Sequence, residues 1–185
     1  MNNITVLPWV QTYTGKKFNF LNITPDSICI EDIAHALSNI CRYTGHTKEF
    51  YSVAQHSIIA SEIVPEEDAF DALMHDATEA YLSDISRPLK TLLPEYKKLE
   101  KKVYKAIADK FNLLYDLPTS VKEADLILLS TEKRDLLGNV EADEWTIIKS
   151  VEPLAKKIYP LKPKEAEEEF LLRYTLLLVK EACNA

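Results

Sequence analysis

The chain has 185 residues, of which 46% are hydrophobic and 28% are charged, and its formal net charge is −7. This length suits one domain with a substantial core, and this hydrophobic content excludes a disordered chain. The acidic balance, without a long Lys/Arg-rich run, argues against binding to duplex nucleic acid, which needs a basic surface. It does not exclude a small phosphorylated ligand, which a few local cations and a metal ion could hold.

The cysteines and the N-terminal residues indicate in which cellular compartment the protein is expected. Cys29, Cys41 and Cys183 are widely spaced and form no CxxC pair, which is typical of free thiols in a reducing environment. The first ten residues have neither the basic start nor the apolar core of a signal peptide. No apolar run approaches the ~18 residues that cross a bilayer. We therefore expect a soluble, cytoplasmic protein with no membrane partner.

The expected elements begin with an N-terminal β-hairpin. Residues 3–23 contain two runs rich in Thr, Val, Tyr and Phe around Gly15 and two lysines, which predicts two strands and a turn. Beyond Pro25, hydrophobic residues recur at helical spacing, and prolines mark helix boundaries. The expected helices cover residues 31–42, 51–64, 66–82, 94–114, 118–138 and 165–182. We expect one all-α domain over residues 1–185 with this short β element.

The stretch MHDATEAYLSD, residues 74–84, places several ionisable groups in an otherwise apolar expected helix. His75 and Asp76 would point about 100° apart on a helix, so both can reach one ion at its edge. Glu79 follows His75 by four residues and would lie one turn further on, above the same spot. Imidazole and carboxylate are ordinary ligands of Zn, Mn, Fe, Co and Ni. Taken alone, however, the dipeptide is better explained as a hydrogen-bonded pair at the edge of the core.

Two further positions favour a metal site. His56 lies on the inward face of the expected helix 51–64, together with Val53 and Ala60. Almost no loop separates this helix from the next one, so the two should pack antiparallel. Asp125 precedes the apolar run LILL, and a carboxylate is expensive to bury without a partner. A bound cation would offset the unfavourable free energy of burying this carboxylate.

Together, His56, His75-Asp76 and Asp125 form an ordered H…HD…D pattern that resembles the HD-domain metal-dependent phosphohydrolases. The similarity is greatest to the compact branch with bacterial 5′-deoxynucleotidases and small viral and bacterial deoxynucleoside triphosphate hydrolases. The matching segments are CRYTGH (41–46), YSVAQHS (51–57), HDATEAYLSDISRPLK (75–90) and VKEAD (121–125). The similar part of the chain runs over residues 30–137. The resemblance implies a single HD-domain helical bundle.

The resemblance also implies one divalent metal ion, with Co, Mn, Zn or Ni as candidates and Mg as an option at the phosphates. Its implied ligands are His56, His75, Asp76 and Asp125. Glu79 would act as the acid/base or water-orienting carboxylate, and Asp84 would support the attacking water. Attack on phosphorus needs these groups together with cations on the non-bridging oxygens.

Several residues are candidates for binding the phosphate. Arg42, Lys90 and Lys122 supply cations, and Lys122 precedes Asp125 by three residues, on the same face of a helix. His46 lies in an expected loop, where a backbone hydrogen bond explains it equally well. Tyr43 stands where relatives often have Trp, so no base preference is carried over.

Counting charges favours deoxynucleoside triphosphates, with dATP as one candidate, because a divalent ion and these cations would over-neutralise a monophosphate. A 5′-deoxynucleotidase acting on dNMPs is the alternative. A non-catalytic nucleotide-binding HD module is less favoured, because it would have no use for Glu79 and Asp84. A cyclic-dinucleotide phosphodiesterase usually needs further His and Asp ligands, and this chain has four histidines. The resemblance leaves a homo-oligomer open.

Overall fold

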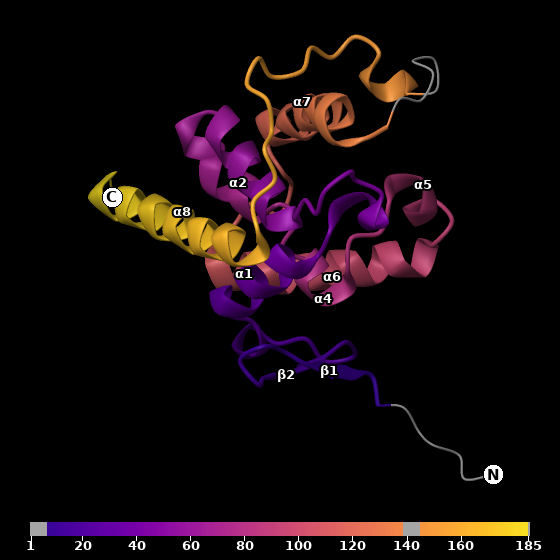
Figure 1. Cartoon of the computed structure of the whole chain (residues 1–185). Helices are drawn as coiled ribbons and strands as arrows, with labels where there is room; N and C mark the ends of the chain where they lie inside the picture. Colours follow the sequence, from indigo (N-terminus) through magenta and orange to yellow (C-terminus); the bar gives the residue numbers. More distant parts are fainter. Residues whose placement is uncertain (1–6, 139–144, 185) are drawn as a thin grey trace, which may run out of the picture.

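The computed structural model describes residues 7–138 and 145–184 (Figure 1). Over these residues the fold is mostly helical, with a short two-stranded antiparallel hairpin near the N-terminus, as the sequence predicts. The strands are β1 (Trp9–Gln11) and β2 (Lys17–Asn19). The helices are α1 (Ile30–Asn39), α2 (Val53–Ile63), α3 (Ala69–Met74), α4 (Glu79–Leu82), α5 (Arg87–Lys90), α6 (Pro94–Phe111), α7 (Thr119–Leu136) and α8 (Pro163–Asn184). In the part of the chain that is described, none of the helices is long and apolar enough to cross a bilayer.

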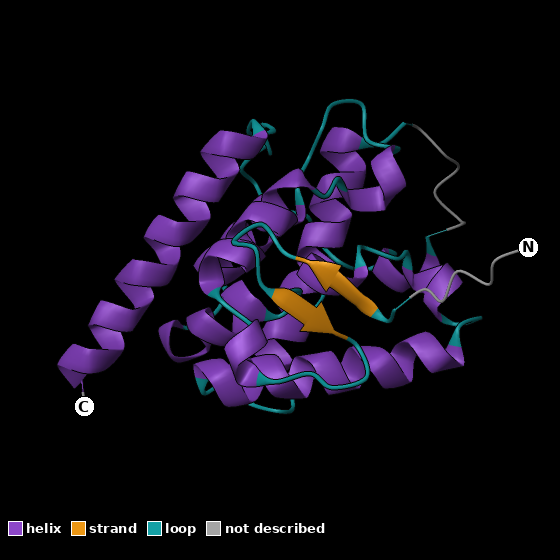
Figure 2. Ribbon diagram, turned by 90° about the horizontal axis from the view of Figure 1, so that it is seen from below, coloured by secondary structure: helices purple, strands orange, loops and turns teal. Residues whose placement is uncertain are grey.

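The hairpin lies below α1 in the view of Figure 1, and in front of the helices in Figure 2. Val10 pairs with Phe18 across the two strands, and Gly15 supplies the positive φ of 83° that the turn needs. Phe18 is fully buried and stacks on Tyr81 with 4.1 Å between ring centroids. The hairpin is therefore an integral part of the core. Residues 3–6 of the predicted hairpin lie outside the described residues.

Helix α2 lies at the centre of the bundle and packs against α1, α3, α7 and α8. The apolar side chains that surround it, including Leu37, Leu73 and Phe170, are fully buried. Eight of the eleven residues of α2 are buried, and only Ile59, Glu62 and Ile63 form a face that reaches solvent. The polar side chains of Gln55, His56, Ser57 and Ser61 are therefore buried, and buried polar groups need hydrogen-bond partners.

The expected continuous helix over residues 66–82 is wrong. A short 3-10 turn (Glu66–Asp68) leads into α3, and residues 75–78 form a tight turn before α4 begins. In this turn, the Ala77 N–H donates to the Met74 carbonyl (3.0 Å) and the Glu79 N–H donates to the Asp76 carbonyl (2.9 Å). These i to i+3 bonds tighten the helix locally. Residues 75 and 76 therefore lie between two helices, and the α-helical spacing assumed for Glu79 does not apply.

The expected helix over residues 31–42 also ends early, because α1 stops at Asn39. The backbone beyond it pairs with the start of α2: the Arg42 N–H donates to the Tyr51 carbonyl (2.9 Å) and the Val53 N–H donates to the Ile40 carbonyl (3.1 Å). Arg42 begins a 3-10 segment, Arg42–Gly45, in which Tyr43 has the positive φ of 55°. Non-glycine residues adopt this conformation only where the surroundings stabilise it. The segment directs Arg42 and Tyr43 into the interior.

Candidate metal centre and cavity

Side chains from α2, α7 and the turn after α3 meet at one point. The Nε2 atom of His56 lies 3.3 Å from Nε2 of His75, 3.7 Å from an Asp76 oxygen and 3.5 Å from an Asp125 oxygen. His75 Nε2 is also 3.3 Å from Asp76. The ligand atoms of His56, His75 and Asp125 all lie within 4.8 Å of one another, so this group could hold a metal ion. The four residues predicted as metal ligands therefore lie close together in the structure.

The hydrogen bonds that Nδ1 of each ring makes determine whether Nε2 of that ring is a donor or an acceptor. His75 Nδ1 lies 2.7 Å from the Ala72 carbonyl, which can only accept, so Nδ1 must carry the proton. His56 Nδ1 lies 2.6 Å from a Glu132 carboxylate oxygen and donates to it in the same way. In the neutral rings both Nε2 atoms then carry lone pairs. Two lone pairs and two carboxylates would then face one another, and a divalent ion bound between them would take the place of a proton on His75.

The ionisable side chains of this metal group shift one another's pKa values. Burial alone would lower the pKa of His75, but the adjacent Asp76 carboxylate outweighs burial and raises that pKa to about 9. Burial would raise the pKa of Asp76, but His75, His56 and Arg42 hold it well below its usual range. The carboxylate of Asp76 is therefore ionised across the physiological range, as a metal ligand must be.

Glu132 connects the metal group to the interior, and the sequence analysis did not find it. It is fully buried and accepts hydrogen bonds from His56 Nδ1 (2.6 Å), the Tyr43 hydroxyl (2.6 Å) and Arg42 Nε (3.2 Å). Burial would raise its pKa, but Arg42 and His56 lower it to about 2. Arg42 also reaches Asp76 at 3.4 Å. One buried carboxylate therefore fixes the tautomer of His56 and the position of Arg42.

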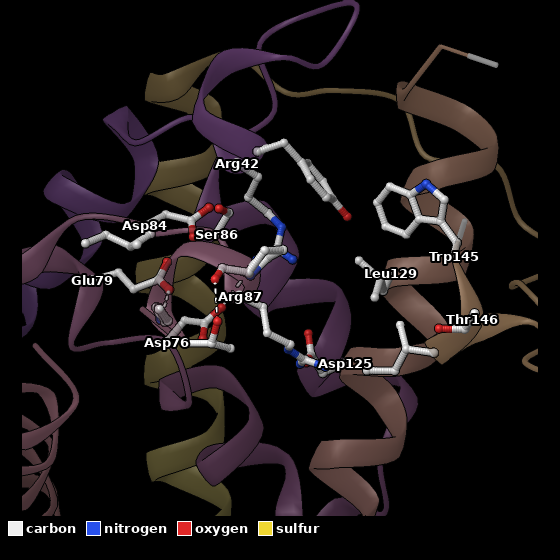
Figure 3. Close-up of a pocket in the computed structure, with 16 residues that line it drawn as sticks. Arg42, Asp76, Glu79, Asp84, Ser86, Arg87, Asp125, Leu129, Trp145 and Thr146 are labelled. Carbon is white, nitrogen blue, oxygen red and sulfur yellow. Dashed lines mark hydrogen bonds and ion pairs between the residues drawn. The ribbon is translucent and has the colours of Figure 1, made fainter. Parts of the chain in front are cut away.

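Beside this group opens a cavity of about 570 Å³. This size is within the range of small-molecule sites, ~300–1,000 Å³. Figure 3 shows Glu79 and Asp84 on one side of the cavity and Leu129 and Trp145 on the other. The lining residues with ionisable side chains are Arg42, Tyr43, Asp76, Glu79, Asp84, Arg87, Lys90 and Asp125. The apolar residues are Ile85, Pro88, Leu129, Trp145 and Ile147.

Glu79 and Asp84, for which the resemblance implies catalytic roles, both line this cavity. Glu79 is only 4% exposed; one of its oxygens lies 3.4 Å from Lys90 Nζ, and the other has no hydrogen-bond partner among the described residues. Burial, reinforced by Asp76 and Asp84, raises the pKa of Glu79 well above its ordinary value. Burial likewise raises the pKa of Asp84. Both carboxyls can therefore hold a proton at a higher pH than a solvated acid.

The predicted phosphate-binding residues divide into two groups. Arg42, Tyr43 and Lys90 line the cavity. His46 and Lys122 are exposed and are not among the residues that line it. Arg87, at the rim, donates to the second oxygen of Asp125 at 2.9 Å.

Fold and site together define a mostly helical protein with a candidate His/Asp metal centre beside a cavity that contains buried carboxylates. The chain is 45% identical to the uncharacterized protein YfdR of Escherichia coli K12 over 178 residues, which cover 96% of this chain and 99% of that protein. It is 31% identical to the uncharacterized protein RCAP_rcc00048 of Rhodobacter capsulatus, over 92% of this chain and 95% of that protein. The chain therefore belongs to the same family as YfdR. No family model matches it.

Proposed function

We propose that this protein is an HD-type, metal-dependent phosphohydrolase that acts on small deoxynucleotides in the cytoplasm. One observation supports the proposal most strongly. The Nε2 atoms of His56 and His75 lie 3.3 Å apart, and both lie close to the carboxylates of Asp76 and Asp125. This donor set suits one divalent ion, and it borders a cavity that contains further ionisable groups.

A divalent ion bound by this group would polarise a phosphate oxygen and acidify a nearby water. The chain's own residues would then handle the protons. Glu79 is buried beside the metal group and has one oxygen without a partner, so it is the best-placed group to exchange a proton with water or with the leaving oxygen. Lys90 lies between Glu79 (3.4 Å) and Glu100 (2.8 Å), which fixes its ammonium group inside the cavity. Asp84 supplies a second proton-holding carboxyl.

The charge of the cavity bears on how many phosphate groups the substrate carries. Triphosphates were expected from the sequence because His46 and Lys122 were counted among the cations of the site, but these two residues do not line the cavity. The cations that do line it, Arg42, Arg87 and Lys90, each lie within 3.4 Å of a carboxylate. Little positive charge is therefore left over for a ligand. This favours a monophosphate, with about two negative charges, over a triphosphate with about four. We accordingly place the 5′-deoxynucleotidase reaction first and dNTP hydrolysis second.

The test is a panel of dNMPs, dNDPs and dNTPs, incubated with metal-stripped protein to which Co²⁺, Mn²⁺, Zn²⁺ or Mg²⁺ is returned. Release of phosphate and nucleoside from dNMPs is the expected result. Release of tripolyphosphate, or stepwise loss of phosphate from dNTPs such as dATP, would instead establish a triphosphohydrolase. Tight nucleotide binding without turnover under every metal would refute the enzyme and leave a binding module.

A further inference from the structure

The apolar side of the cavity has no role in the chemistry proposed above. Leu129 and Trp145 line it, opposite Glu79 and Asp84 (Figure 3), and Ile147 also lines the cavity. Ile147 is 50% exposed and Trp145 is only partly buried. Large apolar side chains gathered on the wall of a polar cavity mark a surface that a ligand covers. Such a ligand must present a flat or apolar face to them.

These side chains are held at a defined place relative to the metal group. Leu129 follows Asp125 by four residues on α7, so it lies one helical turn, about 6 Å, along the axis. Trp145 directly precedes the short 3-10 helix Thr146–Ile148, which packs against α7. The apolar side chains and the metal group therefore border the same cavity at different places along α7.

The indole ring is also fixed from α7. The ammonium group of Lys133, one turn beyond Leu129, lies 5.4 Å from the centroid of the Trp145 ring. Lys133 is not among the residues that line the cavity, so this cation–π contact does not occupy the cavity itself. A contact of this kind restrains the ring before any ligand arrives. A restrained aromatic ring binds a planar ligand with less loss of conformational freedom.

We infer that Trp145 stacks on the nucleobase of the substrate, and that Leu129 and Ile147 complete a base-binding site. This inference rests on the proposed function, because it assumes that the polar side takes the phosphate. Base–aromatic stacking is sequence-tolerant and changes affinity by ~5- to ~100-fold per base. The protein should therefore prefer nucleotides to base-free sugar phosphates, and larger purines to pyrimidines.

The two tryptophans of the chain, Trp9 and Trp145, permit a direct test. Trp9 lies on β1 and does not line the cavity, so Trp9→Phe leaves Trp145 as the only indole reporter. We would titrate Trp9→Phe protein carrying Glu79→Gln, loaded with Zn²⁺, with dAMP and with 2-deoxyribose 5-phosphate. Saturable quenching by dAMP and a much smaller response to the base-free phosphate are expected. Equal responses to the two ligands would overturn the inference.

Steady-state kinetics separate a base contact from a structural role. Trp145→Ala should raise the KM for dAMP by at least about fivefold and change the KM for 2-deoxyribose 5-phosphate by less than about twofold, and Trp145→Phe should restore part of the loss. Trp9→Ala is the matched control and should change neither KM. An equal loss for both substrates would overturn the inference while hydrolysis stands. Quenching by dAMP without hydrolysis of any ester would support the base site and refute the phosphohydrolase.

Discussion

Substituting Glu132 by glutamine should weaken both the metal centre and the fold, because one buried carboxylate serves three donors. One oxygen accepts from His56 Nδ1 at 2.6 Å, and the other accepts from Tyr43 and Arg42 at 2.6 and 3.2 Å. Glutamine has the same shape but replaces one oxygen with an N–H donor. Either orientation of the amide places that donor against an existing donor, on His56 or on Arg42.

The size of the effect follows from these contacts. The guanidinium of Arg42 would lose its fully buried carboxylate partner, and breaking a buried ion pair costs about 3 kcal/mol or more. For a chain of this length, 1 kcal/mol corresponds to about 2–4 °C in Tm, so Tm should fall by roughly 6–12 °C. An amide N–H facing His56 would also favour the proton on Nε2, which removes a metal-ligating lone pair. The affinity for Zn²⁺ should therefore fall by about 10- to 100-fold.

Thermal unfolding and competitive Zn²⁺ titration of the same samples measure the two effects. Glu123→Gln is the matched control, since Glu123 is an exposed residue of the same helix, and its Tm and Zn²⁺ affinity should stay at the wild-type values. If Glu132→Gln protein kept wild-type Tm and Zn²⁺ affinity, Glu132 would not position His56 and the argument from the tautomers would fail.

Three further outcomes are expected. Asp125→Asn should lose stoichiometric metal on dialysis, measured by elemental analysis, and full retention would remove Asp125 from the ligand set. Glu79→Gln should keep the metal and lower kcat by ~10²- to 10⁴-fold; unchanged turnover would exclude Glu79 as the acid/base group. Lys90→Ala should raise the KM for dNMPs by about 2- to 10-fold, because Lys90 contacts the cavity but shares its charge with Glu79 and Glu100, whereas Lys122→Ala should not alter it. A KM raised only by the Lys122 substitution would reverse that assignment.

Helix positions could be predicted from the sequence where apolar spacing and prolines agree. The predicted ranges 51–64, 94–114 and 165–182 correspond to α2, α6 and α8 within a few residues. The turn at residues 75–78 was missed because an apolar pattern does not distinguish i to i+3 from i to i+4 hydrogen bonds. The early end of α1 was missed because it depends on pairing with residues 51–53, which no local signal encodes.

In the candidate site too, some residues could be predicted from the sequence and others could not. The proposed ligands were predicted from their residue types and order, and the structure brings them together. Glu132 was overlooked because it belongs to the charged run EKRD, which is typical of a solvated helix face. A signal was available, since Glu132 follows Asp125 by seven residues and so shares its face of α7. Lys122, three residues before Asp125, was expected on that face but is exposed, because i and i+3 positions still differ by about 60° around the helix.

In the proposed function, the His56, His75, Asp76 and Asp125 group holds one divalent ion on which phosphate hydrolysis depends. The most direct measurement is the rate of phosphate release from dAMP by metal-stripped protein as Co²⁺ or Mn²⁺ is added in steps. We expect no release without metal and a rate that rises to a plateau at one equivalent per chain. Release that is unaffected by metal removal, or a plateau only at two or more equivalents, would contradict the proposed function.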